Sequence, residues 1–212
     1  LHNLSIRSRL ALGFSGQILL IMAILLVTRL SIVTVQHSAQ EAAEQSIPLS
    51  MLAGKMRYHI VQVQQFITDA ALTLNDESLK TARQHADQFQ QGIHLFRQQA
   101  QKEQNTALLN ELTTIEKDFR QYQQQGETMA KTYQTQGREA GNIMMEPFDA
   151  AAEKLANHFD PFLTRYEQQA KNSANTIVDT TTDLLNIGLV LGITALLVSI
   201  LGAWLTAKRI TN

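Results

Sequence analysis

Cysteine is absent from the 212-residue sequence, which also has only three prolines and one tryptophan. Without cysteine the chain cannot form a disulfide framework, a thiolate zinc site, a thiol nucleophile or a covalent c-type haem link. The formal net charge is only −1. The chain therefore lacks the excess of basic residues with which a nucleic-acid-binding protein neutralises phosphates, and no nucleic-acid partner is expected.

Catalytic motifs are missing as well. The sequence has no glycine-rich phosphate loop, no His-Glu-x-x-His zinc motif and no carboxylate pair that its pattern would place in a cleft. We therefore expect a protein that is not an enzyme.

Charge is also missing from two long apolar segments. Residues 10–28 and 184–207 form uncharged runs of 19 and 24 residues, whereas all 19 acidic residues lie between Glu41 and Asp183. An α-helix of about 20 apolar residues crosses a hydrocarbon core of about 30 Å. The sequence therefore predicts two transmembrane helices, at 10–29 and 184–207.

The basic residues beside these segments predict the orientation. Arg7 and Arg9 precede the first segment, and Lys208 and Arg209 follow the second. By the positive-inside rule, residues 1–9 and 208–212 are cytoplasmic and residues 30–183 form one extracytoplasmic domain. A cleaved signal peptide is the alternative for the first segment, but no small-x-small cleavage site ends it.

Residues 30–183 have the composition and spacing of an all-α domain. They are rich in Gln, Ala, Glu, Lys and Leu, and their apolar residues recur at three-four spacing. The four expected apolar seams are Leu49, Leu52, Met56, Val63, Phe66 and Ala70; Leu79, Ala82, Ala86, Phe89, Ile93, Phe96 and Ala100; Leu112, Ile115, Phe119, Tyr122, Gly126, Met129 and Tyr133; and Met145, Phe148, Ala152, Leu155, Phe159, Phe162 and Tyr166. Four such seams predict an antiparallel up-down four-helix bundle whose first and fourth helices continue into the transmembrane helices.

Turn and breaker residues predict where the helices end. Asn75 or Asp76 is expected to cap the second helix, and residues 104–106 to separate the second from the third. Asn142 is expected to cap the fourth helix. Pro48 is expected to kink the first helix or act as a hinge, and Pro161 to restart the fourth helix or kink it.

The order of these segments resembles the N-terminal half of bacterial methyl-accepting chemotaxis proteins. The resemblance rests on Leu-Ser-Ile-Arg-Ser-Arg-Leu at 4–10 and Ala-Lys-Arg-Ile-Thr-Asn at 207–212, each at the cytoplasmic end of a predicted transmembrane helix. The strings at 61–69, 126–130 and 141–149 are similar to a subgroup of the sensor domains in this family.

The resemblance implies a receptor in the bacterial inner membrane. Residues 30–183 would be periplasmic, the chain would form a homodimer, and the stimulus would be a small molecule or a periplasmic binding protein. The signal would reach a HAMP linker that begins with Lys208, Arg209 and Ile210. The chemotaxis kinase and adaptor would bind only a C-terminal half that follows Asn212. Sensor histidine kinases and diguanylate cyclases share this input module and remain the alternative.

A pocket is expected where several polar residues share one layer of the bundle. Folding the chain at 75–76 and 139–140 places His59 level with His94, Tyr122 and His158. Gly126 and Ala152, one turn away, are small enough to leave room for a ligand. Arg57 and Arg120 are expected to face elsewhere, which leaves the layer without a cation.

Three interpretations of this layer remain open. His59 is a core histidine satisfied by Tyr122 or a carbonyl group; or it lines a small-ligand site with Gln62, Asp69 and Tyr133; or it binds haem or a metal ion together with His158 or Met129. Only the third interpretation requires a cofactor, and a Soret band in the absorption spectrum would reveal a bound haem group.

Overall fold

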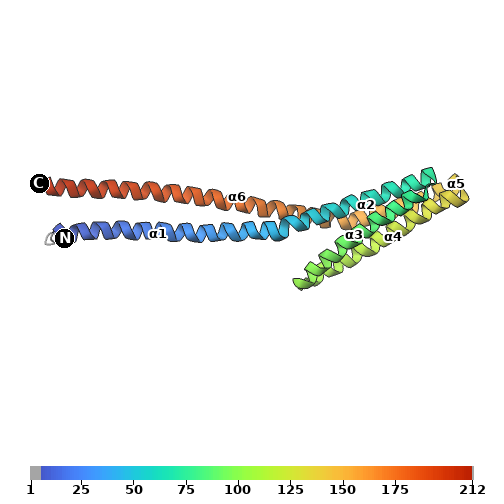
Figure 1. Cartoon of the computed structure of the whole chain (residues 1–212), viewed down its shortest axis with the longest axis horizontal. Coiled ribbons are helices and arrows are strands. Elements are labelled where there is room, and N and C mark those ends of the chain that lie inside the picture. The colour runs from blue at the N-terminus through green and yellow to red at the C-terminus, as the bar shows by residue number, and fades with distance from the viewer. Residues whose placement is uncertain (1–5, 212) are drawn as a thin grey trace. The chain divides into compact units, whose positions relative to one another are not determined.

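The computed structural model describes residues 6–211, including the side chains from Phe14 to Trp204 and that of Lys208 (Figure 1). The helices are α1 (Ile6–Glu41), the π-helix η1 (Ala42–Ser46), α2 (Ile47–Thr73), α3 (Asp76–Lys102), α4 (Thr106–Gln136), α5 (Arg138–Ile143) and α6 (Met145–Thr211). The described part of the chain contains no strand, so the prediction of an all-α fold is confirmed.

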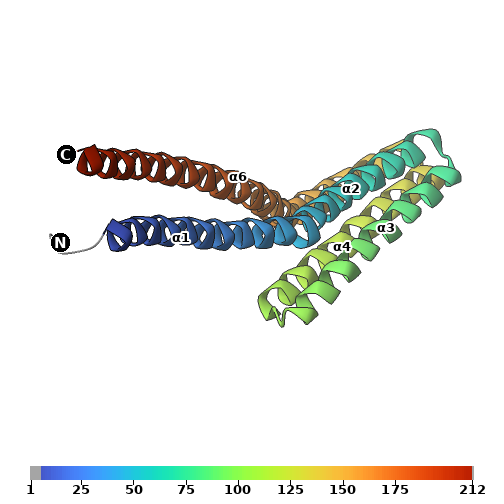
Figure 2. The same cartoon turned by 60° about the vertical axis from the view of Figure 1, so that its left-hand side comes forward.

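The helices form two compact units. One unit contains the residues up to Ala43 together with those from Asn172 onward, and the other contains residues 44–171. The second unit includes α2, α3, α4, α5 and the first part of α6, which Figure 2 shows from another side.

The first unit is built from two apolar helices. The helical segments Phe14–Thr73 and Arg138–Trp204 each contain a stretch that is long and apolar enough to cross a membrane. Apolar side chains such as Leu25 and Leu196 are exposed there, which is the arrangement that lipid contact requires. Within the described apolar stretches, the partly buried residues form one stripe on each helix, which includes Gln17, Leu20, Ile24 and Thr28 of α1 and Leu184, Leu191 and Ala195 of α6.

One hydrogen bond joins the two helices of this unit within their apolar segments. Gln17 Nε2 donates to Ser199 Oγ at 3.1 Å. The Ser199 hydroxyl also donates to the Ala195 carbonyl oxygen of its own helix at 2.8 Å. A polar pair of this kind between apolar segments favours the register in which donor and acceptor meet.

The π-helix immediately precedes Pro48, which lies in the first turn of α2. Proline has no N–H to donate to the preceding turn, and its ring clashes with the carbonyl oxygen four residues earlier. A wider turn at η1 accommodates both effects without ending the helix. Pro161 lies inside α6, which continues through it. The expectation that Pro161 restarts a helix is therefore wrong.

Side-chain caps define the turns within the second unit. The Asn75 side chain accepts a hydrogen bond from the Glu77 N–H at 3.0 Å, and the Asn105 side chain accepts one from the Leu108 N–H at 3.0 Å. The prediction of a cap at Asn75 is confirmed. The prediction for Asn142 is wrong because this residue lies inside α5, which precedes α6.

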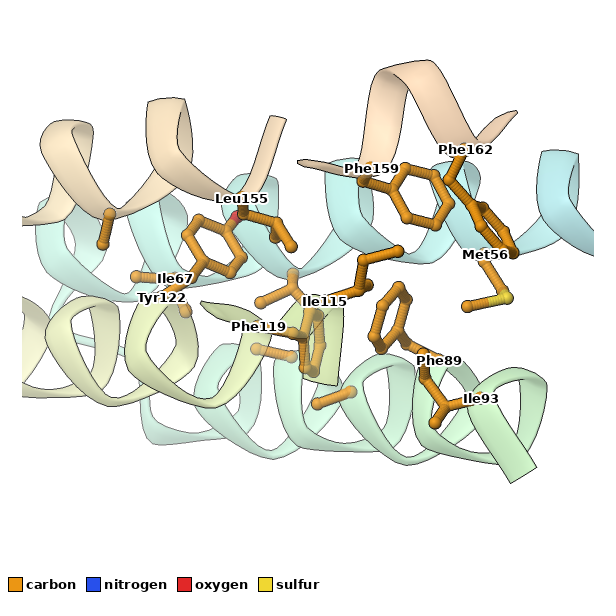
Figure 3. Packing of buried hydrophobic residues seen from close by; sticks show 14 of the residues in the cluster. Met56, Ile67, Phe89, Ile93, Ile115, Phe119, Tyr122, Leu155, Phe159 and Phe162 are labelled. Carbon is orange, nitrogen blue, oxygen red and sulfur yellow. The ribbon is translucent and has the colours of Figure 1, made fainter. Parts of the chain in front are cut away.

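A single hydrophobic core fills the second unit, with side chains from α2, α3, α4 and α6 (Figure 3). Phe89 of α3 stacks on Phe119 of α4 with ring centroids 3.9 Å apart, and Phe96 of α3 meets Phe162 of α6 edge to face at 4.9 Å. Such aromatic pairs add about 0.5–1.5 kcal/mol each to the burial of their surface.

The predicted seams largely coincide with this core. All seven seam residues of α3 are buried, and so are six of the seven in α4. Met145 is the clearest exception, since it is 43% exposed at the first position of α6. Ala151 is buried more deeply than the predicted Ala152, which is consistent with a wider core-facing stripe than a strict heptad seam.

Candidate functional site

A groove of about 260 Å³ lies between α2 and the first part of α6. Its polar lining consists of Arg57, Gln64, Glu153 and Asp160. Its apolar lining consists of Ile60, Val61, Tyr122, Ala152, Leu155, Ala156 and Phe159. A concave apolar surface with a few polar groups is the usual form of a small-molecule site.

Arg57 and Asp160 form an ion pair across this groove. Both side chains are nearly half exposed, and an exposed ion pair contributes only about 0–1 kcal/mol. A ligand that offers each residue an opposite charge can therefore replace the pair at little cost. The expectation that Arg57 faces away from the Tyr122 layer is wrong, because both residues line the same groove.

Tyr122 of α4 reaches the groove from the core. Its side chain is fully buried, its hydroxyl donates to the Ile60 carbonyl oxygen at 3.3 Å, and its ring stacks on Phe148 with centroids 5.1 Å apart. Burial raises the pKa of the Tyr122 phenol well above its usual value, so the group stays neutral. Tyr122 thus offers the groove a rigid aromatic wall.

His59 is not at this groove. Its Nδ1 lies 2.9 Å from Nδ1 of His85 on α3, and both rings are partly buried. The sequence placed His59 level with residue 92, but Gly92 instead lies against Met56. His59 therefore contacts a residue of α3 that lies seven positions, or about two helical turns, before the predicted one. His94 joins neither residue, because its ring hydrogen-bonds to Gln98 of its own helix at 3.0 Å.

The predicted space beside Gly126 is filled. A Cβ atom on Gly126 would lie 2.6 Å from Ile67 Cδ1 and 2.7 Å from Phe148 Cε2. Glycine is needed here because two large side chains of other helices pack directly on the α4 backbone. The expectation that Gly126 leaves room for a ligand is therefore wrong, whereas Ala152 does line the groove.

Three other predicted ligand residues lie apart from one another. Gln62 bonds to Gln65 on the same helix, and Asp69 accepts from the Ser78 hydroxyl at 2.5 Å next to the turn between α2 and α3. The Tyr133 hydroxyl donates to Asn142 Oδ1 at 2.5 Å. None of the three lines the groove between α2 and α6.

His158 belongs to a charged cluster that the sequence did not reveal. Its Nδ1 lies 2.6 Å from Asp118 Oδ2, and Lys154 Nζ lies 2.9 Å from Asp118 Oδ1. Asp118 is only 2% exposed, so this α4 carboxylate depends on its two partners from α6.

The structure does not bring the proposed haem ligands together. His59 pairs with a residue of α3, His158 pairs with a residue of α4, and Met129 is buried in the core. The described residues include no group of three or more His, Asp or Glu side chains that could hold a metal ion. These three residues therefore do not form a haem site in the described structure.

The predicted relay residues lie at the end of α6. Lys208 is exposed, with its Nζ 5.0 Å from the centroid of the Trp204 ring. The side chains of Arg209 and Ile210 lie outside the described part of the structure.

Sequence reasoning missed the residues that matter most to these sites: Arg57, Asp160, Asp118 and His85. Each of the four is the direct neighbour in sequence of a predicted seam residue. The pattern of apolar and polar residues cannot show whether a charged side chain at such a position is solvated or paired with another helix. Lys154 and His158 are four residues apart and so share one face of their helix. A helical-wheel comparison that also paired opposite charges between neighbouring helices would have matched both residues with Asp118.

Comparison of the chain with protein-family models, with curated proteins and with solved structures gives no match.

Proposed function

We propose that the chain is the sensing half of a transmembrane receptor of the methyl-accepting chemotaxis type, and that it binds a small zwitterion in the groove between α2 and α6. The observation that carries this proposal is the pairing of Arg57 with Asp160 at the edge of an apolar groove. Arg57 matches a carboxylate, and Asp160 or Glu153 matches an ammonium group.

The proposal includes an antiparallel four-helix bundle as the ligand-binding domain. Support comes from the core shared by α2, α3, α4 and α6. It also comes from contacts between neighbouring helices in which a higher residue number on one helix pairs with a lower residue number on the other, as in antiparallel helices. Asp69 meets Ser78 and His59 meets His85 between α2 and α3, while Arg165 meets Glu111 and Lys154 meets Asp118 between α6 and α4.

A second copy of the chain is the proposed partner along α2. Exposed apolar side chains follow three-four spacing on this helix, at Ile47, Met51, Tyr58, Val61 and Leu72. Each of these side chains is 42–73% exposed in the described chain, and a seam with heptad spacing is the pattern by which two helices pack. The stripe includes Val61 of the groove, so a homodimer would bring the partner close to the bound ligand.

The mechanism we propose depends on the two helices that border the groove. α2 follows α1 through η1, and α6 is one helix from Met145 to Thr211. A ligand that prefers one packing of α2 against α6 shifts the population toward that packing. A small displacement of α6 then reaches Lys208, Arg209 and Ile210, where a HAMP linker would begin.

The test is a thermal-shift and calorimetric screen of the full chain in lipid nanodiscs against free amino acids and related zwitterions. We expect binding that Arg57→Gln and Asp160→Asn each weaken, because each removes one charge that the ligand needs. Arg120→Gln is the matched control, since Arg120 is 70% exposed and pairs with Glu116 away from the groove. Absence of any zwitterion hit, or a hit that both groove variants retain, would refute direct sensing in this groove.

A further inference from the structure

His59 and His85 present their ring nitrogens to each other from adjacent helices. The two Nδ1 atoms are 2.9 Å apart, the ring centroids are 5.2 Å apart, and the ring planes are inclined by 38°. In two neutral imidazoles, one Nδ1–H can donate to the other Nδ1. The same convergence of two nitrogens is what a metal ion requires of two ligands in neighbouring coordination positions.

Aromatic neighbours hold both rings in place. Phe66 stacks on His85 with centroids 5.6 Å apart and planes inclined by 11°. Tyr58 meets His59 edge to face at 5.2 Å and His85 at 5.9 Å. These contacts restrain both rings, so the two Nδ1 atoms stay close together without a metal ion.

We propose that His59 and His85 bind one copper(II) ion through their Nδ1 atoms. Metal–nitrogen bonds of about 2.0 Å place two ligands at neighbouring corners of a square about 2.8 Å apart, and at two corners of a tetrahedron about 3.3 Å apart. The observed 2.9 Å matches the square. Copper(II) prefers tetragonal geometry, whereas zinc prefers the tetrahedron.

The surroundings are also consistent with a metal that keeps water ligands. Both imidazoles are only partly buried, so solvent can fill the remaining coordination positions. Burial, together with nearby His85 and Lys55, lowers the pKa of His59. The Lys55 cation opposes a bound dication, so the expected Kd is on the order of micromolar and not tighter.

The experiment is a copper(II) titration of the full chain, purified in detergent through a tag without histidine and followed by electron paramagnetic resonance. We expect one copper per chain with the spectrum of a tetragonal site that has two nitrogen ligands. His59→Gln and His85→Gln should each weaken binding by at least about tenfold, because each removes one of only two protein ligands. Zinc should bind more weakly than copper at the same site.

His94→Gln is the matched control, since His94 is an exposed histidine on the same helix as His85 and bonds only to Gln98. It should leave copper binding unchanged. A second readout does not depend on the variants: copper should raise the melting temperature of the wild-type chain, because the ion would join α2 to α3, and a chelator should reverse the shift. Absence of copper binding to the wild-type chain, or equal affinity in His85→Gln, would overturn the proposal.

Discussion

Gly126 shows how one residue without a side chain controls the packing of three helices. Ile67 of α2 and Phe148 of α6 occupy the volume into which a Cβ atom would project. We expect Gly126→Ala to lower the free energy of unfolding by about 1–3 kcal/mol, because the added methyl group overpacks the core. This loss should appear even though alanine favours a helix over glycine by about 1 kcal/mol.

Urea unfolding of the full chain in detergent micelles, followed by circular dichroism, measures the effect of Gly126→Ala. Gln124→Ala is the control, because Gln124 is exposed on the same helix and its replacement should stay within about 0.5 kcal/mol of wild type. Equal free energies of unfolding for the two variants would contradict the prediction, because they would show that Ile67 and Phe148 can move aside for the extra methyl group without cost.

Asp118 is a buried carboxylate whose charge is balanced by Lys154 and His158 of α6. Replacing both Lys154 and His158 by alanine leaves this buried carboxylate without its two partners. We expect this double variant to lose about 3–5 kcal/mol of the free energy of unfolding. Adding Asp118→Ala should recover part of the loss, because the unpaired charge is then removed.

The same urea unfolding experiment tests the Asp118 cluster. Lys117→Ala, at an exposed neighbouring position, serves as the control and should be nearly neutral. If the triple variant is no more stable than the double variant, the carboxylate is not the source of the loss.

Between elements, an ion pair with two hydrogen bonds joins α3 to α4 at the surface. Arg83 donates two hydrogen bonds to Glu127, from Nε to Oε1 at 3.1 Å and from Nη2 to Oε2 at 2.9 Å. The Arg83 guanidinium holds the pKa of the Glu127 carboxyl below its usual value of 4.5. A folded-state pKa below the unfolded value means that the pair stabilises the fold above pH 4.5, and that this contribution is lost as pH falls through the folded-state pKa.

Comparison of Glu127→Gln with wild type from pH 7 to pH 3 tests this contact. We expect the variant to be less stable by up to about 1 kcal/mol at neutral pH, since the pair is partly exposed. The difference should be constant down to about pH 5 and shrink below pH 4.5. Glu167→Gln, at an exposed position of α6, should show no such trend.

The exposed stripe on α2 leads to a prediction about a second chain. In a homodimer packed along this stripe, Met51→Cys would place two thiols close together, and mild oxidation should yield a disulfide-linked dimer. The absence of native cysteine makes the background zero. Gln91→Cys, at an exposed position of α3, should crosslink far less. Equal crosslinking at both positions would exclude a specific α2 interface.

The helices were predictable from the sequence, whereas the contacts between polar residues were not. Three-four spacing identified seven of the nine buried residues of α3 and missed only Ser78 and Gly92, because apolar periodicity reports directly which face is buried. It could not place His59 opposite His85, since that contact depends on where the chain turns between α2 and α3, and an error of about two turns selects different partners. Gly126 was read as empty space because a sequence cannot show which side chain from another helix fills it.

At the scale of the whole molecule, the two span-length apolar helices predict how the chain lies across a membrane. The basic residues that flank the two apolar segments predict that both ends are cytoplasmic. In that orientation, Gln91→Cys on α3 should react with a membrane-impermeant maleimide in intact spheroplasts. Lys208→Cys should react only after the membrane is permeabilised. Labelling of Lys208→Cys in intact spheroplasts would contradict the proposed orientation, as would protection of Gln91→Cys.

The hydrogen bond from Gln17 to Ser199 has a consequence for any motion of one apolar helix along the other. A slide by one helical pitch of about 5.4 Å separates the donor from the acceptor. In a hydrocarbon environment water cannot replace the lost partner, and such interhelical bonds contribute on the order of 0.6 kcal/mol. This contribution is close to the thermal energy, so the pair biases the two helices toward the register in which Gln17 meets Ser199 without locking them there. A modest preference of a stimulus for another register is therefore enough to shift one helix along the other.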